Sequence, residues 1–186
     1  MKLRKYLRVA VIFTTAAVIL LVATASDDDT TYWGPHNYVY RNATQTIPNA
    51  ANTVVSFNPA QEGGDWDNMF DPDHPTYMVC PKEAVYLVTA QAVFEEPNGV
   101  GHCSVYLEEN TNGTWERRAQ QRIPSPEHGD AMVSVAATFA VNAGDKVRMV
   151  VRQTSGGPLD LLVGNDTTNY RPKLAVVFLR PQYGYE

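Results

Sequence analysis

The sequence has few cysteines and none of the short motifs that mark common enzyme classes. Its 186 residues contain two cysteines, Cys80 and Cys103, and no Cys-x-x-Cys pair of the kind found in metal or redox sites. It also contains no His-Glu-x-x-His, no Gly-x-Ser-x-Gly and no glycine-rich phosphate loop. We therefore predict a non-catalytic protein that uses no cofactor.

The histidines do not form a cluster that would compensate for the missing motifs. Each of the four lies in or beside an expected turn, and we interpret them as solvated loop residues. They are His36, His74, His102 and His128. His102 precedes Cys103, but neighbours on a strand point to opposite faces, so this pair does not predict an activated thiol.

Positive charge is scarce outside the N-terminus. The chain has 15 Lys+Arg and 20 Asp+Glu, for a net charge of −5. Residues 1–25 hold four of the basic residues and none of the acidic ones, so residues 26–186 carry 11 minus 20, or −9. An acidic body is a poor match for nucleic acid or an anionic membrane surface. We predict no nucleic-acid partner, and membrane contact only through the N-terminal segment if that segment is not cleaved.

The N-terminus has the layout of an export signal. Met1–Arg8 is basic, and Val9–Ala25 is uncharged and largely apolar. Small residues before Ser26 suit cleavage there, although 17 uncharged residues approach the roughly 20 that span a membrane. We expect residues 1–25 to form an export helix, either a cleaved signal peptide or an anchor, followed by a polar linker at 26–37. Either choice places the body outside the cytoplasm, secreted or at the cell surface.

Beyond residue 25 the sequence alternates with the period of β-strands. In the segment 86–94 one face is wholly apolar, formed by Tyr86, Val88, Ala90, Ala92 and Phe94. A short strand at Tyr77–Cys80 precedes it, and we expect the pair to mark a change of direction inside one sheet.

The segments Met132–Val141 and Lys146–Gln153 flank a tight turn, and their matched alternation predicts a hairpin. About ten such strands predict an all-β sandwich or barrel.

Several segments resemble a known family. Cys80, six positions before Tyr86, resembles the entry to a central strand of complement C1q-like globular heads, in the jelly-roll superfamily that includes the tumour necrosis factors. Further matches are Val39-Tyr40-Arg41, Gln45-Thr46-Ile47-Pro48, Ala143–Val147, Gln153–Gly157 and the apolar last strand. Together they look similar to the bacterial and phage-associated branch. The resemblance implies a two-sheet antiparallel jelly roll over residues 38–181, with a tail at 182–186.

The last strand is apolar on both faces. If Leu174, Val176 and Phe178 fill the core, then Ala175, Val177 and Leu179 point outward, where a one-sided sheet would carry polar residues. Related jelly rolls pack three copies around such strands, so we predict a homotrimer with these three outward residues at its interface. The alternative is that the chain's own termini cover this face, through Tyr32, Trp33, Tyr183 and Tyr185.

Two cysteines in an exported chain favour a disulfide. A bond between Cys80 and Cys103 would close a loop of about two dozen residues, for which chain entropy predicts roughly 3 kcal/mol of stabilisation. The alternative is two separate buried thiols.

Two groups of charged residues are candidate sites. Asp65, Asp67, Asp71 and Asp73 are oxygen ligands suited to Ca²⁺ or, alternatively, aspartates that cap turns, and we assign no metal to them. Arg117, Arg118 and Arg122 form either a site for an acidic ligand or a solvated strand face.

These observations predict an exported trimeric recognition module that binds a protein or glycan ligand through its loops. A structural protein whose task is trimerisation is the alternative, and a jelly-roll glycan hydrolase is a third, weaker hypothesis.

Overall fold

The longest alternating segment forms the central strand of one sheet. This strand, β5 (Ala84–Phe94), buries the predicted apolar face, with Ala90 4% exposed and the other four residues fully buried. The computed structural model describes residues 34–57, 68–163 and 171–182, and all regular structure in these ranges is β-strand. The predicted export helix and the linker up to Trp33 lie outside the described residues.

Six strands form the first sheet, called sheet A here, in which β5 pairs along its whole length with β8 (Ala131–Val141). The other edge of β5 pairs with β11 (Lys173–Pro181), which in turn pairs with β1 (His36–Tyr40). β10 (Leu159–Leu161) and β2 (Gln45–Ile47) extend this sheet beyond the end of β5. Thus β1 begins two residues before the expected domain start at Tyr38.

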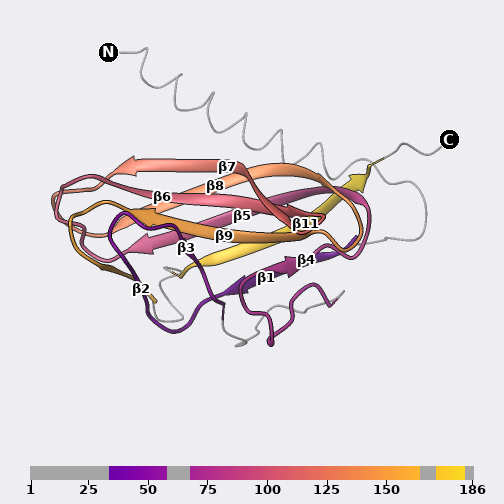
Figure 1. The fold of residues 1–186 in the computed structure, drawn as a ribbon, viewed down its shortest axis with the longest axis horizontal. Helices are drawn as coiled ribbons and strands as arrows, with labels where there is room; N and C mark the ends of the chain where they lie inside the picture. The colour runs from indigo at the N-terminus through magenta and orange to yellow at the C-terminus, as the bar shows by residue number, and fades with distance from the viewer. Residues whose placement is uncertain (1–33, 58–67, 164–170, 183–186) are drawn as a thin grey trace, which may run out of the picture. The chain divides into compact units, whose positions relative to one another are not determined.

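Sheet B has five strands in the path β3 (Thr53–Val54), β9 (Lys146–Gln153), β6 (His102–Thr111) and β7 (Thr114–Pro124), with β4 (Met78–Val79) also pairing with β9. All strand pairs in both sheets are antiparallel, and Figure 1 shows the long strands lying roughly along one common axis with their arrows pointing both ways. The two sheets share one core, which includes Tyr86, Phe139 and Leu174 from sheet A and Leu107 and Met149 from sheet B. The predicted all-β, two-sheet antiparallel sandwich is therefore confirmed. Across the described ranges, no helix has the length and apolar character needed to cross a membrane.

The predicted hairpin of Met132–Val141 with Lys146–Gln153 is wrong. Both segments are strands, but β8 pairs with β5 in sheet A and β9 pairs with β6 in sheet B. The turn between them carries the chain from one sheet to the other. Alternation shows only which side of a strand is buried, and both strands bury that side in the same core.

The segments around Pro81 likewise lie in different sheets. β4 pairs with β9, whereas β5 is central in sheet A, so the expected change of direction within one sheet is also wrong. β6 and β7 do form a hairpin, as the turn residues at Asn110–Gly113 predict. Its two-residue loop is Asn112-Gly113, with positive φ at both residues (55° and 85°), as a type I′ turn requires.

The predicted disulfide is also wrong, because Cys80 and Cys103 are both free and fully buried. The Cys80 amide donates to Asp145 at one end of β9, while Cys103 pairs with Gln153 at the other end. The 8 residues of β9 span roughly 26 Å at about 3.3 Å per residue, far more than a disulfide bridges. Burial raises the pKa of the Cys80 thiol to about 12, and it also raises the pKa of Cys103.

Gln153 fastens the end of β9 to its neighbours. Its side chain is fully buried and donates to the carbonyls of Ile47 (3.0 Å) and Gly157 (2.7 Å). Its Oε1 accepts from both the amide and the hydroxyl of Ser155, each at 2.7 Å. One amide group therefore holds β2 and the turn after β9 in place.

We expect both thiols to resist alkylation in the native protein, because burial keeps them protonated and inaccessible. Under denaturing conditions without reductant, iodoacetamide should add two groups, measured by mass spectrometry. A requirement for reductant before alkylation would contradict two free thiols.

Gln153→Met should destabilise the domain by about 2–4 kcal/mol, since it removes four hydrogen bonds and leaves buried groups without partners. Urea unfolding measures the loss. Gln121→Met on β7 is the matched control, because Gln121 is exposed and its replacement should change stability by no more than about 0.5 kcal/mol. Equal effects of the two substitutions would contradict the role assigned to Gln153.

Candidate functional site

The outward-pointing side chains of sheet A are unusually poor in charge. These positions, called the sheet A outer face here, follow from the alternation opposite the buried residues. They are Tyr38 on β1; Lys173, Ala175 and Val177 on β11; Val85, Leu87, Thr89 and Gln91 on β5; and Met132, Ser134, Ala136, Thr138 and Ala140 on β8. Lys173 is the one charged residue among these positions, and the other two charged residues on this side of the sheet, Arg180 opposite Val85 and Asp160 on β10, lie toward its ends. An antiparallel sheet that faced water would carry polar side chains here.

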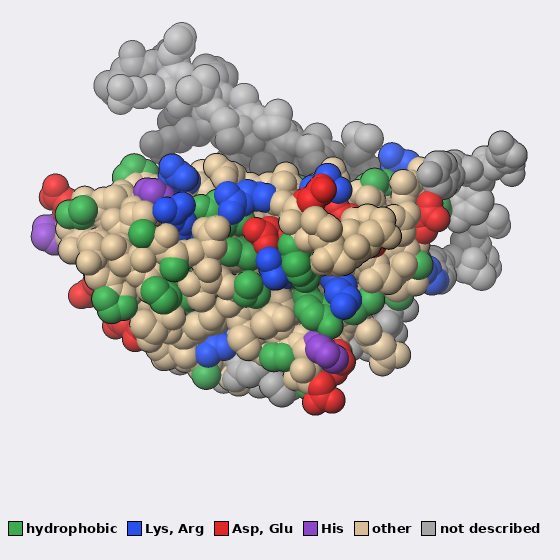
Figure 2. Space-filling model, in the orientation of Figure 1, with side chains coloured by type: hydrophobic (Ala, Val, Ile, Leu, Met, Phe, Trp, Pro, Cys, Tyr) green, Lys and Arg blue, Asp and Glu red, His purple; other side chains and the backbone are tan. Residues whose placement is uncertain are grey.

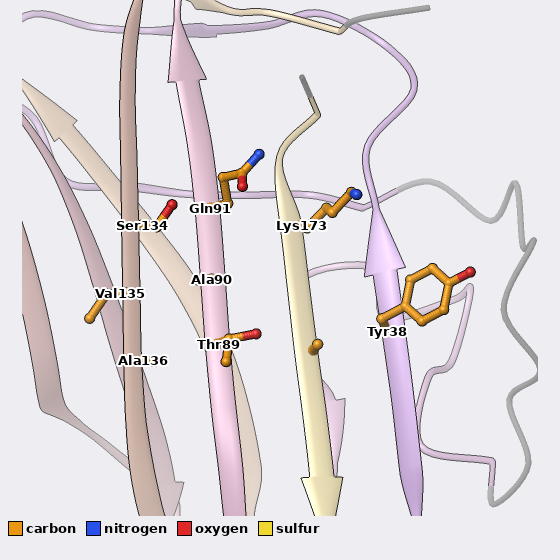
Figure 3. Close-up of a pocket in the computed structure, with 9 residues that line it drawn as sticks. Tyr38, Thr89, Ala90, Gln91, Ser134, Val135, Ala136 and Lys173 are labelled. Atoms are coloured by element: carbon orange, nitrogen blue, oxygen red, sulfur yellow. The ribbon is translucent and has the colours of Figure 1, made fainter. Parts of the chain in front are cut away.

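A groove runs across the middle of this face. The register aligns Tyr38, Ala175, Thr89 and Ala136 in one row across four strands, and the three small residues in it leave space above the sheet. The groove has a volume of about 600 Å³, and its wall includes Gln91, Ser134 and Lys173. Figure 3 shows these side chains around the groove, with the Tyr38 ring projecting from β1 on one side.

Large apolar side chains are also exposed around the groove. The described residues include five large hydrophobic side chains with high exposure, and four belong to sheet A. These four are Tyr38 (43% exposed), Met132 (51%), Val177 (40%) and Leu179 (48%). The fifth, Val100, lies in the loop before β6. The exposed apolar surface is therefore concentrated on one sheet.

The three residues predicted for an interface have the expected exposure. Ala175 lines the groove, and Val177 faces outward beside it. Leu179 lies in a bulge between Phe178 and Arg180, where the alternation of β11 is interrupted. The alternative cover by Tyr32, Trp33, Tyr183 and Tyr185 concerns residues outside the described ranges.

The outer face of sheet B has the opposite character. Arg148 donates to Glu108 at 2.9 and 2.8 Å, and Arg118 donates to Glu109 at 2.6 Å. Figure 2 shows basic and acidic side chains mixed over β6, β7 and β9. Arg117, for which an acidic ligand and a solvated strand face were the two alternatives, stacks on the Tyr106 ring, with its guanidinium carbon 3.6 Å from the ring centroid. Together with Arg118, it is therefore engaged within the domain.

The acidic loop does not present a formed cation site in its described part. The Asp71 carboxylate accepts the Asp73 amide (2.9 Å) and contacts His74 Nδ1 at 2.7 Å. These hydrogen bonds, that with His74 first, lower the pKa of Asp71. Asp65 and Asp67 lie outside the described residues. Within the described part of the chain, no group of three or more His, Cys, Asp or Glu is placed to hold a metal ion.

Comparisons with known proteins identify the fold. No protein-family model and no curated protein matches the sequence. Among solved structures, the Eiger TNF of S. frugiperda covers 82% of this chain and 98% of its own, at 17% identity and a TM-score of 0.54. The globular domain of zebrafish complement 1qA covers 79% and 99%, at 18% identity and 0.52. Murine APRIL at pH 8.0 covers 77% and 98%, at 12% identity and 0.57.

The chain therefore has the fold of the TNF and C1q globular heads, which confirms the resemblance at the level of fold. The bacterial and phage-associated branch remains a prediction. Sequence reasoning missed the β5 and β8 residues of the groove. The small residues Ala136 and Ala140 at outward positions of β8 were the sequence signal that could have indicated the groove.

Proposed function

We propose that this protein is an exported, non-catalytic recognition module that assembles as a homotrimer through the sheet A outer face. The difference in charge between the two sheets carries this proposal. Sheet B carries ion pairs between arginines and glutamates. The middle of sheet A instead presents apolar and small side chains with Lys173 as their one charged neighbour, while Arg180 and Asp160 lie toward the ends of the sheet. The ligand is a protein or glycan that the loops contact.

The outer face of sheet A is suited to another copy of the chain. Small residues at the centre, Thr89, Ala136 and Ala175, let a partner approach the strands closely. Around them, Tyr38 and Val177 provide apolar area whose burial stabilises association by about 25 cal/mol per Å². Patches of this kind on soluble domains mark interaction sites.

A closed ring accounts for such a face better than an open chain of contacts. Cyclic symmetry covers the patch on every copy and leaves none exposed for further growth. The fold shared with TNF and C1q heads supports a ring of three. Export rests on the sequence of residues 1–25. The non-catalytic role is supported by the lack of enzyme motifs and by a groove lined mainly by alanine, threonine and other neutral side chains.

Light scattering coupled to size-exclusion chromatography should give the mass of three chains for the protein. Ala136→Arg should yield single chains, because it places a long charged side chain in the centre of the groove at an exposed position that the isolated fold tolerates.

Gln120→Arg is the matched control, since Gln120 is an exposed strand residue on sheet B. It should leave the mass unchanged. A single-chain mass for the unmodified protein, or dissociation by both substitutions alike, would contradict assembly through sheet A.

A further inference from the structure

Three buried polar atoms without a hydrogen-bond partner belong to one end of the sheet B outer face. They are Ser104 Oγ, Arg152 Nε and His102 Nε2. Ser104 is fully buried and pairs in the ladder with Arg152 on β9 and with Arg122 on β7. His102 lies two residues before Ser104 on β6, so its side chain is on the same face. These three atoms belong to β6 and β9, and Arg122, which is exposed, adds a side chain from the neighbouring strand β7.

The His102 ring is held in place by the turn after β9. Thr154 Oγ1 accepts the His102 backbone amide at 3.0 Å and lies 2.9 Å from the ring nitrogen Nδ1. Gly101 permits this approach, because its φ is 74° and a Cβ there would clash with the Thr154 carbonyl. When the Thr154 hydroxyl donates to Nδ1, the ring proton resides on Nε2, which is then a donor without a partner.

Arg122 and Arg152 differ from the other arginines of this face. Arg118 and Arg148 each form an ion pair with a glutamate, and Arg117 lies 3.9 Å from Glu108. No carboxylate pairs with Arg122 or Arg152 among the residues that the structure describes. Burial lowers the pKa of His102, and the positive charges of Arg122 and Arg152 lower it further.

We propose that Ser104, Arg122, Arg152 and His102 form a binding site for a tetrahedral oxyanion, a sulfate or phosphate ester group carried by the ligand. Every free polar atom in the set is a hydrogen-bond donor or an adaptable hydroxyl, and the two fixed charges are positive. An anion accepts from such donors and also balances the two positive charges. Donors arriving from three strands suit a group whose oxygens point in several directions.

The site is independent of trimerisation, since it lies on the sheet facing away from the groove. The site rests on the proposed recognition function, and it refines that function by specifying which chemical group of the ligand is bound. A body with a charge of −9 over residues 26–186 repels anions in general, so binding here depends on local contacts. We therefore expect selectivity for compact anions over extended polyanions of similar charge.

Calorimetric titration with sodium sulfate, and separately with inorganic phosphate, at constant ionic strength set by chloride, should show saturable binding of one anion per chain. The His102 ring signals in NMR should shift along the same isotherm. Ser104→Ala and Arg122→Met should each weaken binding by about tenfold or more, since each removes one hydrogen bond to the charged group.

Arg117→Met is the matched control, because it removes the same charge from the same strand outside the site. The dissociation constant of this variant for the anion should stay within about twofold of that of the unmodified protein. Absence of saturation, or an equal loss with Arg117→Met, would overturn the site. Ser104→Ala removes a buried hydroxyl that has no partner, so a folded variant is expected and keeps the test decisive.

A second pair of probes tests whether the bound group is a sulfate ester or a phosphate ester. A sulfated oligosaccharide and glucose 6-phosphate should compete with the inorganic anions, whereas unmodified glucose should not. Tighter binding of one of them identifies sulfate or phosphate esters as the source. Failure of both to compete would overturn the role of the site in ligand recognition, and the chain mass would still report on assembly separately.

Discussion

The fold depends on one constraint, which is that a sandwich can bury only one face of each sheet within its own core. In sheet B the other face is compatible with water, because Arg148 and Arg118 pair with glutamates across neighbouring strands. In sheet A the other face is mostly small or apolar. The domain is therefore complete as a folded core but leaves one largely apolar face exposed, and the proposed assembly rests on that asymmetry.

The two outer faces have different tasks in this account. The central row of sheet A combines Thr89, Ala136 and Ala175, whose small side chains suit close approach by a second chain. The outer face of sheet B carries Arg122 and Arg152, which form no ion pair with a carboxylate among the described residues. Covering one sheet with further copies leaves the other available to a ligand on each copy. Gln153, buried at the end of β9, fixes the neighbouring turn from which Thr154 orients His102.

The alternation of apolar and polar residues was sufficient to predict features that belong to one strand alone. The buried face of β5, the bounds of β9 and the outward direction of Ala175 and Val177 all follow from period-two alternation. Pattern identified the hairpin of β6 with β7 from its turn residues, but it failed for two other strand pairings. β8 and β9 alternate as a hairpin would, yet they belong to different sheets, and Cys80 and Cys103 lie at opposite ends of β9.

The proposed oxyanion site could be predicted only in part from the sequence, because it too depends on which strands pair. Arg122 was recognised as a basic residue on a strand face, but Ser104 and Arg152 join it only through the pairing of β6 with β7 and β9. Sequence spacing does not reveal that Arg117 and Arg118 are engaged in the domain while Arg122 lacks a carboxylate. That distinction depends on Glu108 and Glu109, which the ladder places beside the first two arginines.

The most direct test of the central claim is hydroxyl-radical footprinting of the native protein with mass spectrometry, followed at Tyr38 and Met132. In a single chain their side chains are 43% and 51% exposed. If further copies cover the sheet A outer face, labelling of Tyr38 and Met132 should be low at high protein concentration and should rise on dilution as the copies separate. Strong labelling of both residues that does not depend on concentration would contradict the account.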